Sequence, residues 1–79
     1  MSAAETAVRA LATARYPYME VWCHAAPSGR HYVLGGATRH AHVTLGGGAV
    51  GGAPPEAAWE AAEVAMRREV AYALARARA

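Results

Sequence analysis

The stretch GGGAVGGAPPEAAWEAAEVAMRREVAYALARARA, residues 46–79, decides the fold of this chain. Its glycine-rich beginning leads through Pro54, Pro55 and Glu56 into a long alanine-rich segment. A proline is tolerated in the first turn of a helix, and an acid just behind it suits the positive end of the helix dipole. We therefore expect a helix from about Pro55 to Ala77. Its apolar stripe should lie on a sheet and contain Trp59, Ala62, Met66, Val70, Ala73 and Leu74.

The N-terminal residues predict a second, shorter helix. Ser2 to Glu5 reads S-x-x-E, the pattern of a capping box, in which a serine and a glutamate satisfy the first backbone donors of a helix. Pro17 forces Tyr16 toward extended geometry, so this helix should end near Arg15. Its apolar stripe comprises Ala4, Val8, Leu11 and Ala12.

From Tyr18 the apolar period changes to two, which indicates a strand with one buried face. The residues expected in the core are Met19, Val21 and Cys23. Pro27-Ser28-Gly29 predicts a turn into a second strand near residues 30–35, which forms an antiparallel hairpin with the first. Either Val33 alone or Tyr32 with Leu34 could face the core. We favour Tyr32 and Leu34 because they bury more apolar area.

Residues 39–45 alternate as a third strand. The inward set is Ala41, Val43 and Leu45, and the outward set is Thr38, His40, His42 and Thr44. A further short strand is possible around Ala49 and Val50. The sequence therefore predicts one α+β domain over residues 1–79, in the order α-β-β-β-α. It has an antiparallel sheet of three or four strands, a short N-terminal helix and a long C-terminal helix.

The composition indicates the kind of genome that encodes the chain and excludes some classes of partner. Among the 79 residues there is no Lys, Asp, Asn, Gln, Ile or Phe, and all eight basic residues are Arg. AT-rich codons are avoided, which indicates a high-GC bacterium or a phage or mobile element that lives in one. The formal charge of +2 is too small to indicate nucleic acid or a membrane surface as a partner.

One cysteine excludes a disulfide framework and fits a reducing compartment. Residues 1–15 lack the apolar core of a signal peptide, and no apolar run approaches the ~18 residues of a membrane span. We therefore expect a cytoplasmic protein.

The outward face of the predicted sheet is the candidate functional surface. Large aromatic side chains on such a face are typical of an interface with a partner. The alternative is that the N-terminal helix covers this face and forms a second core there. We expect the surface to meet a host protein complex or a second copy of the chain. The predicted contact residues are Tyr18, Trp22, His24, His40 and His42, with His31 and Thr44 as further members of the face.

Some residues of the same face also have the side chains that bind metals. His40 and His42 point to one side of a strand, and His24 or His31 could supply the third ligand that a zinc site requires. Only Glu20 is near enough to orient such a ligand, so we expect neither a metal nor another cofactor.

Two further patterns in the sequence bear on catalysis and phosphate binding. Cys23 and His24 are adjacent in a strand and point to opposite faces, which excludes them as a nucleophile and base. The glycine cluster before the long helix lacks the Lys-Ser/Thr ending of a phosphate-binding loop. We therefore do not expect an enzyme.

The order α-β-β-β-α resembles the double-stranded-RNA-binding domain. In that family the last helix opens with a basic Lys-Lys-x-Ala-Lys segment, whereas residues 55–59 here read PEAAW. RNA binding by that route is therefore not expected. Residues 51–58, GGAPPEAA, also resemble the strand-to-helix joint of small HicB-type antitoxins.

Small size, GC-rich bias, no catalytic constellation and an aromatic-bearing surface together resemble the small phage-encoded inhibitors of the anti-CRISPR type. Such inhibitors block a host complex by occupying one of its surfaces. The resemblance implies a non-enzymatic binding module of this kind. The alternatives are a nucleic-acid-binding or antitoxin-like regulatory module and, third, a metal sensor that uses the histidines.

Overall fold

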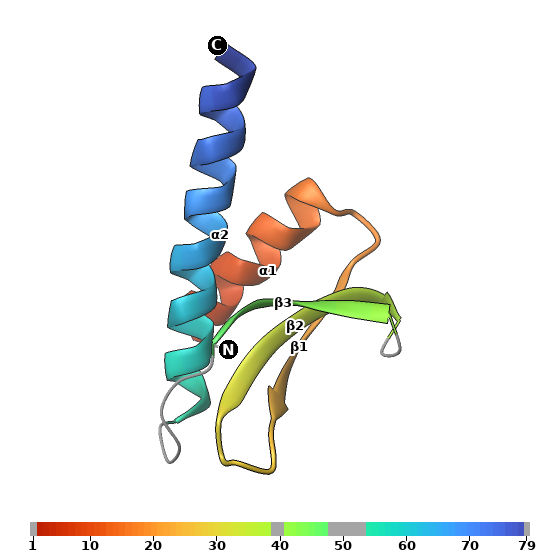
Figure 1. Cartoon of the computed structure of the whole chain (residues 1–79), viewed down its shortest axis with the longest axis vertical. Coiled ribbons are helices and arrows are strands. Elements are labelled where there is room, and N and C mark those ends of the chain that lie inside the picture. The colour runs from red at the N-terminus through yellow and green to blue at the C-terminus, as the bar shows by residue number, and fades with distance from the viewer. Residues whose placement is uncertain (1, 39–40, 48–53, 79) are drawn as a thin grey trace.

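A computed structural model describes residues 2–38, 41–47 and 54–78 of the chain. Its elements are helix α1 (Ala3–Arg15), strands β1 (Glu20–Ala25), β2 (His31–Thr38) and β3 (Ala41–Gly47), and helix α2 (Pro55–Arg78) (Figure 1). The strands form one antiparallel sheet in the order β1-β2-β3. The predicted α+β class and element order are confirmed, while the short strand expected around Ala49 and Val50 lies outside the described residues.

Helix α1 begins and ends where the sequence predicts. The Ser2 hydroxyl accepts the backbone N–H of Glu5 at 3.1 Å. The Glu5 carboxylate accepts from Arg9 Nε at 3.0 Å, so it pairs with the next turn of the helix. After Arg15, Tyr16 caps the helix with φ −132°, an extended value that the following proline favours. The buried residues of α1 belong to the predicted stripe: Ala4, Val8 and Ala12.

The turn between β1 and β2 is confirmed at residues 27–29. Gly29 adopts φ 86°, a left-handed conformation that other residues rarely take. Its N–H donates to the Ala26 carbonyl at 2.9 Å, and the Ala26 N–H donates to the Arg30 carbonyl at 2.8 Å. Strands β1 and β2 begin later than expected. In particular, β1 begins at Glu20, after a turn that contains Tyr18.

The strand register corrects one core prediction. Cys23 is opposite Val33, and residues opposite each other in an antiparallel pair project from the same face. Val33 therefore faces the helices with Cys23, and it is fully buried. The prediction that Tyr32 and Leu34 face this core is wrong, because the turn sets the register and a shift of one residue exchanges the two faces. Leu34 is also buried, but on the opposite face.

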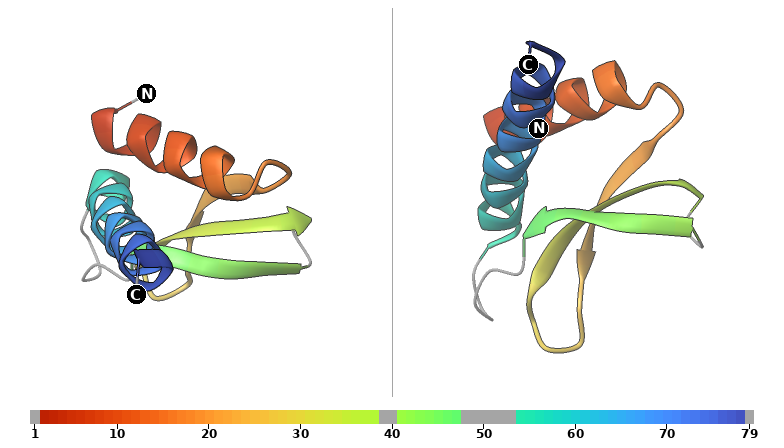
Figure 2. Two further views of the ribbon diagram at one scale, coloured as in Figure 1. Left: turned by 90° about the horizontal axis from the view of Figure 1, so that it is seen from above. Right: turned by 45° about the horizontal axis from the view of Figure 1, so that its top comes forward.

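Both helices lie on the same side of the sheet. A single core cluster joins residues of α1, β2 and α2, namely Ala4, Val8, Ala12, Val33, Ala58, Trp59, Ala62 and Met66. Both views of Figure 2 show the two helices together, with the sheet to one side of the pair. The alternative in which α1 covers the other face is therefore wrong. Five partly buried side chains pack against this cluster, and all five were predicted to face the core: Leu11, Met19, Val21, Cys23 and Leu45.

Strand β3 approaches α2 so closely that one position admits no side chain. A Cβ atom built on Gly46 would lie 2.4 Å from Ala62 Cα and 2.8 Å from Ala62 N. Real Cβ contacts are not this short, and the obstructing atoms belong to the backbone of a helix. Gly46 therefore allows β3 to pack closely against α2.

Two residues that were predicted to be buried lie outside the core. Leu74 is 53% exposed and Val43 is 59% exposed, so both predictions of burial are wrong. Figure 1 shows that α2 rises past α1 and that β3 begins away from α2; Val43 is the third residue of that strand. Trp59, Ala62 and Met66 are buried as predicted, and Val70 is half-buried. The side chains of Thr38, Ala41 and Ala73 lie outside what the structure describes.

Neither helix of the described residues has an apolar segment long enough to cross a membrane.

Candidate functional site

The face of the sheet away from the helices carries a hollow of about 300 Å³. Each strand contributes to it: Trp22 and His24 come from β1, Leu34 from β2 and His42 from β3. The register places these side chains on one face, since Trp22 is opposite Leu34, and Leu34 is opposite Thr44 two residues after His42. We call this surface the open face; it comprises Glu20, Trp22, His24, Tyr32, Leu34, Gly36, His42 and Thr44.

An aromatic contact closes one side of the hollow. The rings of Trp22 and His42 meet edge to face, with centroids 5.6 Å apart and planes at 74°. Gly36 is opposite both Glu20 and His42 in the sheet. Because Gly36 has no side chain, the imidazole can reach diagonally across β2 to the indole. Leu34 lies beside them and is 8% exposed, so it forms an apolar floor without any cover from a helix.

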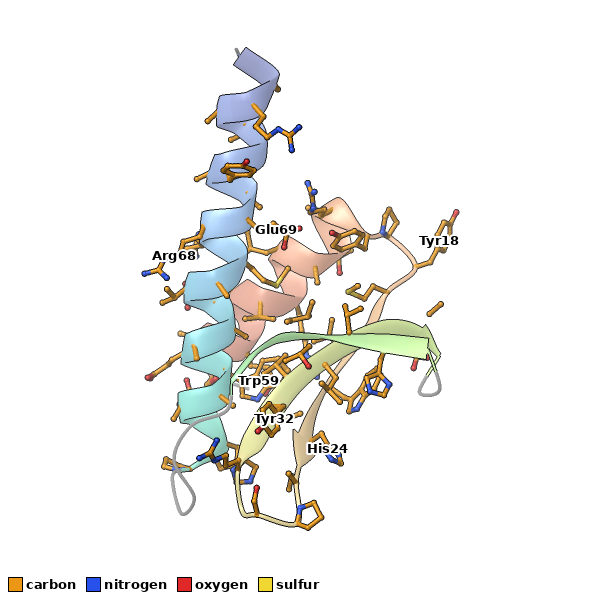
Figure 3. All side chains as sticks on the ribbon, in the orientation of Figure 1. Tyr18, His24, Tyr32, Trp59, Arg68 and Glu69 are labelled. Atoms are coloured by element: carbon orange, nitrogen blue, oxygen red, sulfur yellow. The ribbon has the colours of Figure 1, made fainter. Side chains whose placement is uncertain are left out.

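The predicted site residues separate into three groups. Trp22, His24 and His42 come together in the hollow. Tyr18 does not join them: it lies in the turn before β1, is 92% exposed, and is far from His24 (Figure 3). His40 lies outside the described residues. Of the further members, His31 is opposite Ala25 and so projects from the helix side of the sheet.

Three members of the open face are not predicted by the sequence. Tyr32 and Leu34 are predicted in the helix-side core, and nothing in the sequence assigns Gly36 to a face. The sequence signal for Gly36 was the glycine itself. A glycine inside a predicted strand often marks a place where other groups approach the backbone closely.

The structure brings no three potential metal ligands together among the residues it describes. His24 and His42 both line the hollow. The predicted pair of His40 and His42 is not tested, because His40 lies outside the described residues. The expectation of no bound metal stays a prediction. Elemental analysis of tag-free protein should give less than one equivalent of zinc, nickel or copper. One tightly held equivalent that is lost in His42→Ala would contradict it.

Cys23 is a free, half-buried thiol on the helix side of the sheet. Burial, and then the negative charge of Glu5, raise the pKa of the Cys23 thiol. The thiolate is the reactive form of cysteine, so a raised pKa makes this group a weak nucleophile near neutral pH. His24 projects from the opposite face, which agrees with the expectation that the two residues do not act together.

Polar contacts on the helix side connect the elements of the fold. Arg9 donates to the Val21 carbonyl at 2.8 Å, and its guanidinium carbon lies 5.3 Å from the centroid of the Trp59 ring. Arg9 therefore joins α1 to both β1 and α2. Sequence analysis missed this role, although Glu5 and Arg9 have the spacing of a helical ion pair.

A second set of polar contacts joins the end of α1 to α2. The Glu69 carboxylate accepts from Arg15 Nε and from the Tyr16 hydroxyl, each at 3.1 Å. Figure 3 shows Glu69 on the side of α2 that faces α1, whereas Arg68 projects away from it. An ion pair within α2 joins Arg67 Nη2 to Glu63 Oε2 at 2.8 Å. These charges have structural partners, which leaves the open face as the candidate site.

No family model matches the chain, and no curated protein or solved structure matches it either. The functional argument therefore depends on the open face and on the composition. The resemblances to anti-CRISPR inhibitors, antitoxins and the double-stranded-RNA-binding domain stay hypotheses.

Proposed function

We propose that this protein is a non-enzymatic binding module that covers a surface of a protein partner with its open face. The observation that carries the proposal is the position of both helices on one side of the sheet, with an aromatic-lined hollow on the other. Binding hot spots are commonly tryptophans in desolvated pockets surrounded by contacts that exclude water. Trp22, beside Leu34 and His42, has this setting.

The chemistry of the hollow favours one kind of partner. Its floor and wall are apolar at Leu34 and Trp22, and its polar groups are the imidazoles of His24 and His42. The one fixed charge on the described part of the open face is the carboxylate of Glu20. We therefore propose a partner that inserts an apolar side chain flanked by polar groups, which can form hydrogen bonds with the two imidazoles.

We further propose that this partner is a bacterial host complex and that the protein is a cytoplasmic inhibitor carried by a phage or mobile element. Support comes from the small size, the avoidance of AT-rich codons and the lack of an acid, base and nucleophile grouped on the described surface. Blocking a complex requires a fitted surface and no chemistry of its own. A chain of 79 residues can provide such a surface.

The experiment has two steps. The full chain is first used to isolate its partner complex from a high-GC host, and the affinity for the purified partner is then measured for Trp22→Ala. We expect a loss of about 2 kcal/mol or more, roughly a 30-fold rise in Kd. Tyr72→Ala is the matched control, because Tyr72 is an aromatic residue 65% exposed on α2. Its affinity should equal that of the wild type.

Two results would overturn the proposal. A folded Trp22→Ala variant that binds the partner as tightly as the wild type would remove the open face from the interface. Binding to RNA or DNA with a steep salt dependence, and to no protein, would favour the regulatory alternative.

A further inference from the structure

The second half of α2 extends beyond the core that the rest of the chain forms. Met66 is the last buried residue of this helix among those described, although the helix continues to Arg78. Figure 1 shows the later turns rising past α1. Packing within the described chain therefore does not explain the large side chains that these turns carry.

Three exposed side chains of this half lie on successive turns of the helix. Arg68, Tyr72 and Arg76 are four residues apart, a spacing that places side chains one above the other on a helix. Tyr72 is 65% exposed, and the guanidinium carbon of Arg76 lies 5.7 Å from the centroid of its ring. The backbones of the two arginines are about 12 Å apart along the helix axis. We call these three residues the basic stripe.

The charges of the basic stripe are not balanced within the described part of the chain. The nearby Glu69 carboxylate is already paired with Arg15 of α1. Neither Arg68 nor Arg76 has an ion-pair partner among the described residues. Figure 3 shows Arg68 projecting from the side of α2 away from Glu69. The positive charge is therefore local to this surface and accessible to a group from outside the chain.

The helix dipole accounts for only part of this pattern. A cation in the last turn of a helix is favourable because the helix carries a partial negative charge there. Arg76 is in that turn, whereas Arg68 is ten residues before Arg78, where α2 ends. The dipole also does not require an exposed aromatic residue between two arginines. A binding role accounts for all three residues, because arginine and tyrosine are enriched among interface hot spots.

We propose that the basic stripe binds an acidic segment of a second protein partner. One carboxylate of that segment pairs with each arginine, and an apolar side chain between them packs against Tyr72. Guanidinium groups form paired hydrogen bonds with carboxylates, and complementary charge selects the partner. The stripe is on α2, whereas the open face is on the far side of the sheet, so this inference does not depend on the proposed function. Tyr72→Ala should therefore weaken this second contact and leave the first unchanged.

The charges of α2 favour a protein segment over nucleic acid. Affinity for nucleic acid rises with the number of phosphates that basic side chains neutralise, and the basic stripe offers two guanidinium groups. Glu56 and Glu60, which have no ion-pair partner among the described residues, lie on the first half of the same helix. They would repel a phosphate backbone that follows α2. A short acidic segment avoids this repulsion because it contacts the second half alone.

The test is a titration of the full chain with a fluorescently labelled helical peptide in which two glutamates bracket a leucine at the same four-residue spacing. We expect a Kd below about 1 mM that rises with salt. Arg68→Ala and Arg76→Ala should each raise Kd at least about threefold, and the double variant at least about tenfold. Arg30→Ala is the matched control, because Arg30 is exposed just before β2 and its loss removes the same charge away from the stripe.

Backbone amide NMR shifts locate the contact independently of the variants. The amides of residues 68–78 should move as the peptide is added, whereas those of β1 should not. Trp22→Ala should bind the peptide like the wild type, which separates this test from that of the open face. A peptide with glutamine in place of both glutamates should not bind in the same range.

Any of four results would overturn the proposal. These are a wild type that does not bind the acidic peptide at about 1 mM, equal binding of the glutamine peptide, and an unchanged Kd in the double variant. The fourth is binding to duplex DNA that is tighter than binding to the peptide and is lost in the double variant, which would assign the basic stripe to nucleic acid.

Discussion

The two tryptophans of this chain lie on opposite faces of one sheet, in different surroundings. Trp59 is 4% exposed, in a cluster that also contains residues of α1 and β2, with the Arg9 guanidinium over its ring. Trp22 is half-buried, with its ring against the edge of His42 and beside Leu34. On the helix side, the indole of Trp59 is enclosed by residues of α1, β2 and α2. On the open face, the indole of Trp22 lies against neighbouring side chains of the sheet, His42 and Leu34.

This difference separates residues that hold the fold from residues that shape a surface. The helix side is closed mainly by small and aliphatic side chains such as Ala62, Val8 and Val33, all fully buried. Such side chains allow helices to approach a sheet closely. The open face instead carries rings and imidazoles, which combine apolar area with polar edges and suit a surface that meets water and a partner in turn.

The largest expected effect tests the enclosed side. Trp59→Ala should lower the free energy of unfolding by about 3–5 kcal/mol, because it removes a large buried side chain and leaves a cavity. A domain of this size has little more than that in total. Denaturant unfolding followed by far-UV circular dichroism measures the change. A loss below about 1 kcal/mol would show that Trp59 is not in the core.

A smaller effect is expected where the sheet meets α2. Gly46→Ala should cost about 1–3 kcal/mol, because the added methyl group would overlap the backbone of Ala62. Ala62→Gly should not rescue it, since two of the three nearest atoms are the Cα and N of residue 62. Unfolding curves of both single variants and the double variant measure this. Full rescue would mean that the Ala62 side chain is the obstacle.

Trp22→Ala should cost only about 1 kcal/mol in folding, because the side chain is half-buried and lies outside the core cluster. The same unfolding experiment applies, with Trp59→Ala measured alongside. Equal losses at the two tryptophans would contradict the division of the sheet into an enclosed and an open face.

The smallest effect is expected at the end of α2. Leu74→Ala should change the unfolding free energy by no more than about 0.5 kcal/mol, since Leu74 is 53% exposed. Met66→Ala, eight residues earlier on the predicted stripe and 2% exposed, should cost about 2–5 kcal/mol. A large loss at Leu74 would mean that another surface covers it, in this chain or in a second copy.

Much of the fold could be predicted because its signals are local. The Ser2 cap, the proline at the start of α2 and the turn at Gly29 each act within a few residues. The faces of β2 could not be predicted in the same way, because they depend on which residues of β1 stand opposite. Choosing Tyr32 and Leu34 by apolar area ignored the turn geometry that places Val33 beside Cys23.

The candidate site was predictable in part for the same reason. Trp22, His24 and His42 follow from alternation within single strands. Leu34 and Gly36 required the register between strands, and Tyr18 was assigned to a strand that begins two residues later. Burial of Leu74 failed for a different reason: a stripe on a helix shows which side is apolar but not how far the neighbouring elements extend.

Helix α2 extends 24 residues, yet its last buried side chain among those described is Met66, in its first half. Glu69 is held by Arg15 and Tyr16, and the turns after it have no part in the described core. Opening these final turns sacrifices almost no burial, so their amides should exchange with solvent by fraying, while those near Trp59 exchange only when the whole domain unfolds. We therefore expect one continuous helix to combine slowly exchanging amides near Trp59 with rapidly exchanging amides in its final turns.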